Sequence, residues 1–282
     1  MTTEVHHPSD IQLGRIAYRR GKAIRSVLVA ALSTAVIGTL LVVLITGAPG
    51  WERVKQSFFD PQIARHYLPD ILEGLWLNIR LFVVCAACAL LLGLFASVLR
   101  TLRGPVFFPV RALATIYTYS FRGLPLIITI YLFAFGIPGL RLQGTPNVTV
   151  LGGAAITITY GSYIAEVLRA GIESVHPSQL AAARSLGLSY RQSMRFVVLP
   201  QAVRRAAPAL LNDVVSMQKD VGLISLAGPI DAIRAAQIAT AEATNYTPYV
   251  VAGVLFVLFA LPLIGITDFV TLRAARRQNA GT

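Results

Sequence analysis

The sequence predicts an all-α membrane protein, a polytopic helical bundle with about six transmembrane helices. Hydrophobic residues make up 55% of the 282 residues and charged residues only 13%, whereas a soluble domain carries about 25% charged residues. The mean hydropathy is +0.64. The apolar residues gather in windows of about 20 residues or more, the length that crosses a bilayer as a helix.

Six windows are predicted to be spans. The first is uninterrupted by charge, the third is broken near Gly123 and Pro125, and the fifth is only half apolar because Lys219 and Asp220 lie inside it. In chain order the windows are 26–47, 75–99, 106–137, 148–168, 206–228 and 248–270. The first run follows a basic segment and, at about 22 residues, is longer than a signal-peptide core, so we expect it to be retained.

The positions of the 25 basic residues predict the orientation. With the N-terminus inside, 17 of them fall in inside segments, 5 in outside segments and 3 within spans. Lys and Arg accumulate in short cytoplasmic loops, so both termini are predicted to be cytoplasmic. This asymmetry explains the net charge of +12, so no nucleic-acid partner is expected. The hydrophobic composition indicates that the lipid bilayer is the partner.

Motifs that carry chemistry are few. Cys85 and Cys88 lie inside a span, where small side chains let helices pack closely, and not in the polar setting of a redox or metal Cys-x-x-Cys. No His-Glu-x-x-His, Gly-x-Ser-x-Gly or P-loop sequence occurs. We therefore expect no catalytic residue, metal site or cofactor on this chain, and any ATP and Mg²⁺ that drive it would be bound by a partner subunit.

Residues 178–200 form a basic, turn-rich segment between hydrophobic stretches. Pro177 suits the first turn of a helix, where an amide donor would be unpaired. The helix is expected to run through Leu186, and Gly187 is placed to end it in a left-handed cap.

A second short helix is predicted to follow. Ser189 and Gln192 have the spacing of a capping box, and Pro200 is expected to limit the helix. Two short helices at an angle would form a rigid projecting knob that a cytoplasmic partner could grip. The alternative is an ordinary basic loop that only sets topology.

The same segment resembles a known family. Its Ala-Ala, Gly and Leu-Pro spacing is similar to the cytoplasmic "EAA" loop of bacterial ABC importer permeases. Five stretches occur in the order and spacing of permeases of the polar amino acid uptake subfamily, the histidine, glutamine, glutamate and arginine importers. These stretches are 121–126, 165–172, 182–189, 199–202 and 219–220.

The resemblance implies a permease subunit of an ATP-driven importer in the bacterial cytoplasmic (inner) membrane. It would pair with an identical or similar second permease subunit, bind an ABC ATPase through the loop, and receive substrate from an extracytoplasmic solute-binding protein. The docking and coupling residues that it implies are Ala181, Ala182, Ala183, Gly187, Leu199 and Pro200.

The resemblance also implies a division of the chain. It covers about residues 73–273, the permease transmembrane domain with its coupling loop at 178–200. The remaining segments are expected to be a cytoplasmic basic tail, an additional N-terminal transmembrane helix that only some members have, an extracytoplasmic loop and a second cytoplasmic tail, at 1–25, 26–47, 48–72 and 274–282 respectively.

The sequence departs from the family pattern at three places. Ala181 stands where the loop motif has an acidic residue, Leu124 where Thr follows Arg-Gly, and Val221-Gly222 where Thr-Ser follows Lys-Asp. The first puts a polar contact with the ATPase in doubt. The other two weaken any transfer of substrate specificity.

A substrate path is predicted at the two interrupted spans. The half-helix that begins near Pro125 would aim its amide donors and positive dipole end at the midplane, where a carboxylate could bind, with Gly123 giving a permissive backbone. Charges at the bilayer centre cost roughly 2.5–3.5 kcal/mol each on insertion scales, so Lys219 and Asp220 should face the bundle or water. The path residues are Arg122, Gly123, Leu124, Pro125, Lys219 and Asp220.

The charged residues of the predicted spans also have structural interpretations, which the sequence leaves open. Arg122 could snorkel or form a structural salt bridge, and Lys219 and Asp220 could pair with each other. Glu166 and Arg169, three apart on one helix, are expected to form a local ion pair. At the level of the whole chain, the alternatives are a permease of another ABC importer class, for peptides or osmolytes, and a non-transporting membrane scaffold that recruits a cytoplasmic partner.

Overall fold

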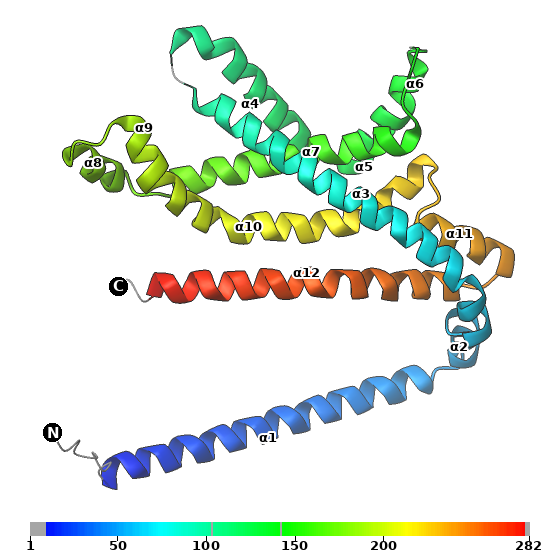
Figure 1. Ribbon diagram of the computed structural model, residues 1–282. Helices are drawn as coiled ribbons and strands as arrows, with labels where there is room; N and C mark the ends of the chain where they lie inside the picture. Colours follow the sequence, from blue (N-terminus) through cyan, green and yellow to red (C-terminus); the bar gives the residue numbers. More distant parts are fainter. Residues whose placement is uncertain (1–9, 103, 142, 280–282) are drawn as a thin grey trace. The chain divides into compact units, whose positions relative to one another are not determined.

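The computed structural model describes residues 10–102, 104–141 and 143–279, and every regular element in these ranges is helical (Figure 1). The predicted all-α class is confirmed. The ends of both predicted tails, together with Arg103 of the charge count, lie outside the described residues. The elements are α1 (Asp10–Thr46), α2 (Trp51–Phe58), α3 (Pro61–Thr101), η1 (Pro105–Phe107), α4 (Phe108–Gly123), α5 (Leu126–Tyr131), η2 (Leu132–Gly136), α6 (Ile137–Gly139), α7 (Val148–Glu173), α8 (Pro177–Ser185), α9 (Tyr190–Ser193), η3 (Met194–Val198), α10 (Leu199–Asp220), η4 (Val221–Ala227), α11 (Ala232–Ala243) and α12 (Thr247–Asn279).

Four helices are long and apolar enough to cross a membrane, and the number rises to six if each of two bent helix pairs is counted as one span. The chain divides into two units, residues 1–57 and 58–282. The first unit contains α1, whose apolar stretch Gly21–Thr46 has a mean hydropathy of 2.6. This stretch includes nearly all of the predicted first span.

The segment 48–72, expected to be a loop, is largely helical. In the second unit Asp60 accepts hydrogen bonds from the backbone N–H groups of Gln62 (2.8 Å) and Ile63 (3.2 Å) and so caps α3. Pro61 takes the first helical position, where its missing N–H costs nothing. The first turns of α3 therefore occupy residues that the hydropathy window assigned to a loop.

The core of the second unit lies where α3 packs on α7, and α10 packs on both α7 and α12 (Figure 1). Small residues let the helices approach. A Cβ on Gly93 would lie 2.6 Å from Cγ2 of Ile164, and one on Gly161 would lie 2.9 Å from Cδ2 of Leu92. Since either contact would force a neighbour to move, the α3–α7 crossing depends on these glycines.

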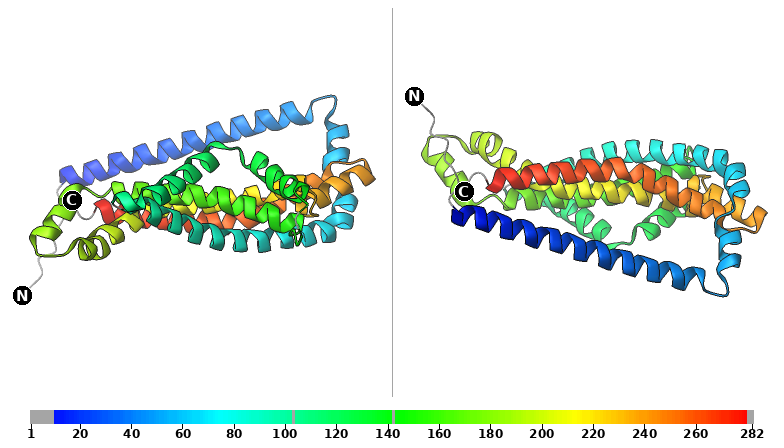
Figure 2. Two further views of the ribbon diagram at one scale, coloured as in Figure 1. Left: turned by 90° about the horizontal axis from the view of Figure 1, so that it is seen from above. Right: turned by 90° about the horizontal axis from the view of Figure 1, so that it is seen from below.

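The predicted break in the third span is confirmed. The chain bends by 111° between the helical stretches Pro105–Gly123 and Leu126–Gly139, and the left view of Figure 2 shows this sharp bend between α4 and α5. Leu124 is extended (φ −86°, ψ 132°) because the residue before a proline is pushed out of the helical region. Gly123 remains helical as the last residue of α4, so the expected role of a permissive glycine backbone is not what opens the span.

A second bend, of 52°, separates the segment that ends at Ala227 from α11. A buried polar cluster holds it against α3. Asn78 donates to Asp231 (2.9 Å) and accepts from the backbone N–H of Ala232 (3.1 Å), and Asp231 caps α11 by accepting from the N–H of Arg234 (2.9 Å). Both Asn78 and Asp231 are fully buried, so each polar group needs the other.

Candidate functional site

The segment 177–200 folds as a knob whose first half matches the prediction. α8 begins at Pro177 and ends at Ser185. The N–H of Leu188 bonds the carbonyl of Ala183 (3.2 Å) and the N–H of Gly187 bonds that of Arg184 (3.0 Å), the pair of bonds that defines a Schellman motif. Gly187 has φ +83°, the left-handed conformation that glycine adopts without steric cost.

The second half of the knob differs from the prediction. The expected capping box is present, with Ser189 and Gln192 each accepting from the other's backbone N–H at the start of α9. Pro200, however, does not end the helix. The π-helical turn Met194–Val198 precedes it, and the chain continues as α10, because a proline in the first turn of a helix has no hydrogen bond to lose.

The knob is fixed to the ends of α7 and α10. Val175, Val198 and Ala202 form a buried cluster at its base, and an N–H of Arg205 donates to the carbonyl of Ser174. A Cβ on Gly171 would lie 2.9 Å from the carbonyl oxygen of Ala202, so the two helices approach closely here. A force applied to the knob would therefore reach both spans.

The docking residues implied by the sequence divide into two groups. Ala183 is buried and anchors α8, whereas the others are exposed, namely Ala181, Ala182, Gly187, Leu199 and Pro200. The structure adds apolar side chains that the motif did not point to: Leu186 is 84% exposed and Phe196 is 62% exposed. Large apolar side chains within a basic loop were the sequence signal that could have identified them.

The predicted path residues are brought together only in part. Arg122 lies at the end of α4, with Gly123, Leu124 and Pro125 in the break. The hydroxyl of Tyr160 donates to Asp220 (2.7 Å), and the charged neighbours of Tyr163 include both Asp220 and Arg122.

Lys219 is not among the charged neighbours of Tyr163. It is exposed, while its neighbour Asp220 is held by Tyr160, so the structural alternative in which these two charges pair is not what the structure shows.

Asp213 also lies in this region, although it belongs to none of the sequence motifs. Its Oδ2 atom is buried and has no hydrogen-bond partner among the described residues, and it too is a charged neighbour of Tyr163. A buried carboxylate oxygen without a partner is costly, which makes α10 between Asp213 and Asp220 a place where a cationic group could be bound.

An ion cluster lies toward the C-terminal end of α7, around Glu166. Its carboxylate bonds Arg169 on the same helix (2.5 Å), as expected, and also Arg100 at the end of α3 (2.8 Å). Arg122 is 3.5 Å away. Arg169 bonds Glu173 as well. One carboxylate thus joins α3, α4 and α7 beside the break in the third span, and Arg122 lies within salt-bridge distance of it.

A protein-family comparison identifies the fold. Residues 89–276, all within the second unit, match the family described as "Binding-protein-dependent transport system inner membrane component". The chain belongs to this family. The permease is thus a component of a binding-protein-dependent transport system of the inner membrane, as the motifs implied.

Individual relatives agree. The arginine transport system permease protein of Bacillus subtilis (strain 168) is 32% identical over 200 residues, which are 70% of this permease and 88% of that protein. The probable glutamine ABC transporter permease protein of the same organism is 32% identical over 195 residues, 68% and 87% of the two chains. A solved structure of an amino acid ABC transporter matches with a TM-score of 0.69 at 28% identity, covering 77% of this permease and 98% of that chain. These relatives are transporter permease subunits and not known enzymes.

Proposed function

We propose that this permease is the membrane-spanning subunit of an ATP-driven importer of polar amino acids. It forms the translocation path together with a second permease subunit, identical or similar, and a solute-binding protein delivers the substrate from outside. The sequence has no P-loop, so ATP and Mg²⁺ are bound by a separate ATPase subunit. The amino acid substrate is supported by the relatives, which are named for arginine and glutamine transport.

The knob at 177–200 is the docking site for the ATPase. The observation that supports this most is its construction: a Schellman turn and a capping box make it rigid, while Leu186 stands 84% exposed at its corner. A rigid element with an exposed apolar side chain can enter a groove on a partner and transmit the partner's motion. The distribution of basic residues supports a cytoplasmic position for the knob and for both termini.

The path passes between α4, α7 and α10. An amino acid carries an ammonium and a carboxylate, and this region offers charges of both signs. Asp213 and Asp220 lie on α10, Arg122 lies at the end of α4, and all three are charged neighbours of Tyr163. A transported zwitterion would meet an anionic side and a cationic side in one passage.

ATP-dependent uptake tests the proposal. The permease, its ATPase and its binding protein are reconstituted in liposomes and offered labelled arginine, glutamine, histidine and glutamate, with a dipeptide and glycine betaine as the alternatives. We expect ATP-dependent uptake of at least one amino acid and none of the dipeptide or betaine. Uptake of only the dipeptide or only the betaine would assign the permease to another importer class.

A further inference from the structure

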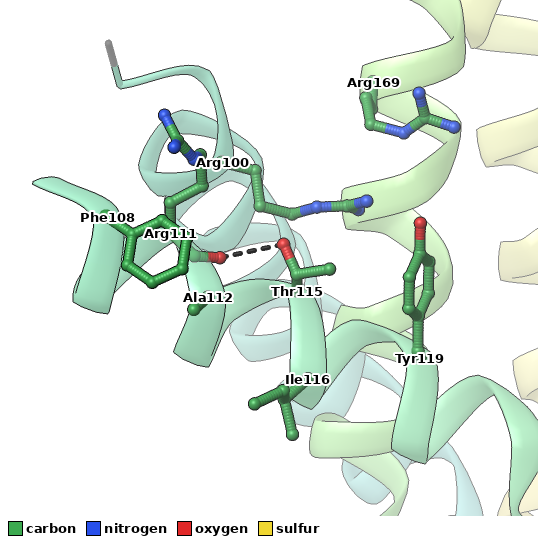
Figure 3. A pocket seen from close by; sticks show the side chains of 8 residues that line it. All are labelled: Arg100, Phe108, Arg111, Ala112, Thr115, Ile116, Tyr119 and Arg169. Carbon is green, nitrogen blue, oxygen red and sulfur yellow. Dashed lines mark hydrogen bonds between the residues drawn. The ribbon is translucent and has the colours of Figure 1, made fainter. Parts of the chain in front are cut away.

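A cavity of about 430 Å³ lies at the corner between α3 and α4 (Figure 3). One wall is a single face of α4, where Phe108, Ala112, Ile116 and Tyr119 follow one another at helical spacing. Arg111 and Thr115 also come from α4, Arg100 comes from the end of α3, and Arg169 comes from the end of α7. Among the described residues, its lining includes no residue of the knob and none of the charged residues of the proposed path, Arg122, Asp213 and Asp220.

Three arginines line the cavity, and they come from three different helices. Arg100 ends α3, Arg111 lies in the first turns of α4, and Arg169 lies in the last turns of α7. The described lining contains no carboxylate. Two of the arginines keep donors for a ligand, since a guanidinium has five N–H groups. Arg100 uses one on Glu166 (2.8 Å) and Arg111 uses one on the carbonyl of Leu102 (3.1 Å).

The nearby carboxylates do not balance this charge. Glu166 and Glu173 accept from Arg169, and Glu166 also binds Arg100 and lies 3.5 Å from Arg122. Three arginines therefore share two carboxylates. A fourth, Arg111, donates to a backbone carbonyl and lies over the ring of Phe108, and it takes part in neither pairing. The surplus charge is positive, and Arg111 places it in the lining of the cavity.

The rim of the cavity is apolar and exposed. Phe108 and Ile116 are each 61% exposed and Tyr119 is 58% exposed. These side chains lie on the α4 wall, so a ligand held by the arginines would continue along an apolar helix face. Charged donors beside exposed apolar side chains suit a molecule with an anionic head and a hydrocarbon tail, and basic pockets between transmembrane helices bind acidic lipid headgroups.

We propose that this cavity binds the phosphate-bearing headgroup of an acidic phospholipid, with Arg100 and Arg111 donating to its phosphate and its acyl chains lying along α4. The cavity is at the same end of the bundle as the knob, because α7 runs from Arg169 directly into α8. The assignment of the lipid to the cytoplasmic leaflet rests on the orientation given under the proposed function. The proposal that a lipid binds does not depend on that orientation. Through Arg100 and Arg169 the headgroup touches the cluster around Glu166, which holds the broken third span.

Native mass spectrometry of the purified full-length permease tests this binding without ATP or substrate, so its outcome is independent of transport. The protein is mixed with equal amounts of phosphatidylglycerol and phosphatidylcholine with the same acyl chains. We expect phosphatidylglycerol to be retained preferentially. Arg111→Gln should lower its retention about fivefold, the effect of removing one arginine near an anionic headgroup. Ala112→Phe, which fills the cavity wall without changing charge, should lower it as well and serves if Arg111→Gln fails to fold.

Arg273→Gln is the matched control. Arg273 also lies over a phenylalanine ring, that of Phe269, near the same end of the bundle, but outside the cavity. It should retain phosphatidylglycerol as the parent does. Equal retention of the two lipids by the parent, or equal losses in Arg111→Gln and Arg273→Gln, would overturn the proposal. Displacement of the lipid by excess inorganic phosphate would also overturn it, because the cavity would then select a free anion.

Discussion

Glu166 carries much of the electrostatic organisation of this permease at the scale of single residues. Its side chain is 16% exposed and that of Arg100 is 6% exposed, so the pair is largely removed from water. Removing one member of a buried ion pair lowers the free energy of unfolding far more than replacing both members with apolar residues. The neighbouring pair of Arg169 with Glu173 is different, because the Glu173 side chain is 62% exposed.

Glu166→Gln and Glu173→Gln therefore form a matched comparison. Each removes one negative charge from a carboxylate that binds Arg169. We expect Glu166→Gln to lower the free energy of unfolding by about 3 kcal/mol and Glu173→Gln to lower it by less than about 1 kcal/mol. Thermal midpoints of the purified proteins measure this. Similar midpoints for the two variants would show that the cluster around Glu166 is not a stability element.

Gly187 is required for its backbone conformation and not because a larger side chain would clash with its surroundings. Its φ is +83°, and nothing lies within 4 Å of the position that a Cβ would take, so a larger residue would be strained without clashing. Gly187→Val should cost roughly 1–2 kcal/mol locally and reduce both ATPase association and uptake, while membrane insertion is unchanged. Gly187→Asn should be much milder, since Asn tolerates the left-handed region. Normal ATPase association by Gly187→Val would mean that this turn does not shape the docking site.

At the scale of elements, the permease is distinguished by two spans that bend. The first bend follows from local chemistry, because a proline acts on the residue before it wherever it stands, and the sequence was sufficient to place it near Pro125. The second bend is held by Asn78 and Asp231, which are 153 residues apart. No local sequence pattern indicates a contact between residues so far apart, so this contact could not be predicted from the sequence.

The difference between local and long-range contacts also explains which parts of the knob could be predicted. Gly187, Ser189 and Gln192 act over a few residues, so the turn and the capping box could be predicted. The π-helical turn before Pro200 could not, because it depends on how α10 packs at the base of the knob. The charges of the proposed path were predicted only in part for a similar reason. The grouping of Asp213 and Asp220 with Arg122 around Tyr163 requires α4, α7 and α10 to be placed together.

Gly74 tests the second bend. A Cβ there would lie 2.5 Å from the backbone nitrogen of Ala232 and 2.6 Å from the carbonyl oxygen of Asp231. Gly74→Ala must therefore push α3 away from the start of α11, and we expect it to cost about 3 kcal/mol or more. Gly253→Ala in α12, where nothing lies within 4 Å, should leave stability unchanged or raise it. A thermal midpoint of Gly74→Ala equal to that of the parent would contradict the packing described for α3 and α11.

At the scale of the whole molecule, the proposed orientation places the knob and both termini on one side. In a background without Cys85 and Cys88, cysteines introduced as Arg20→Cys, Arg191→Cys and Arg276→Cys should be shielded from an impermeant thiol reagent in intact cells. Arg65→Cys should be labelled, since the proposed orientation places its segment outside. Labelling of Arg191→Cys from outside would show that the topology is the reverse of the one proposed. The knob would then lie outside, where a cytoplasmic ATPase could not bind it.

The central claim is that this permease conducts amino acids past the charges of α4 and α10, and the initial rate of ATP-dependent uptake by Asp220→Asn tests it most directly. Asparagine can still accept the hydrogen bond from Tyr160 but has no charge, so assembly should be unchanged. Lys219→Gln is the control, because Lys219 is exposed and is not among the charged neighbours of Tyr163. We predict that Asp220→Asn loses uptake at least tenfold, equivalent to about 1.4 kcal/mol, while Lys219→Gln transports like the parent. Uptake by an assembled Asp220→Asn importer at more than about half the parental rate, well short of that tenfold loss, would contradict the claim.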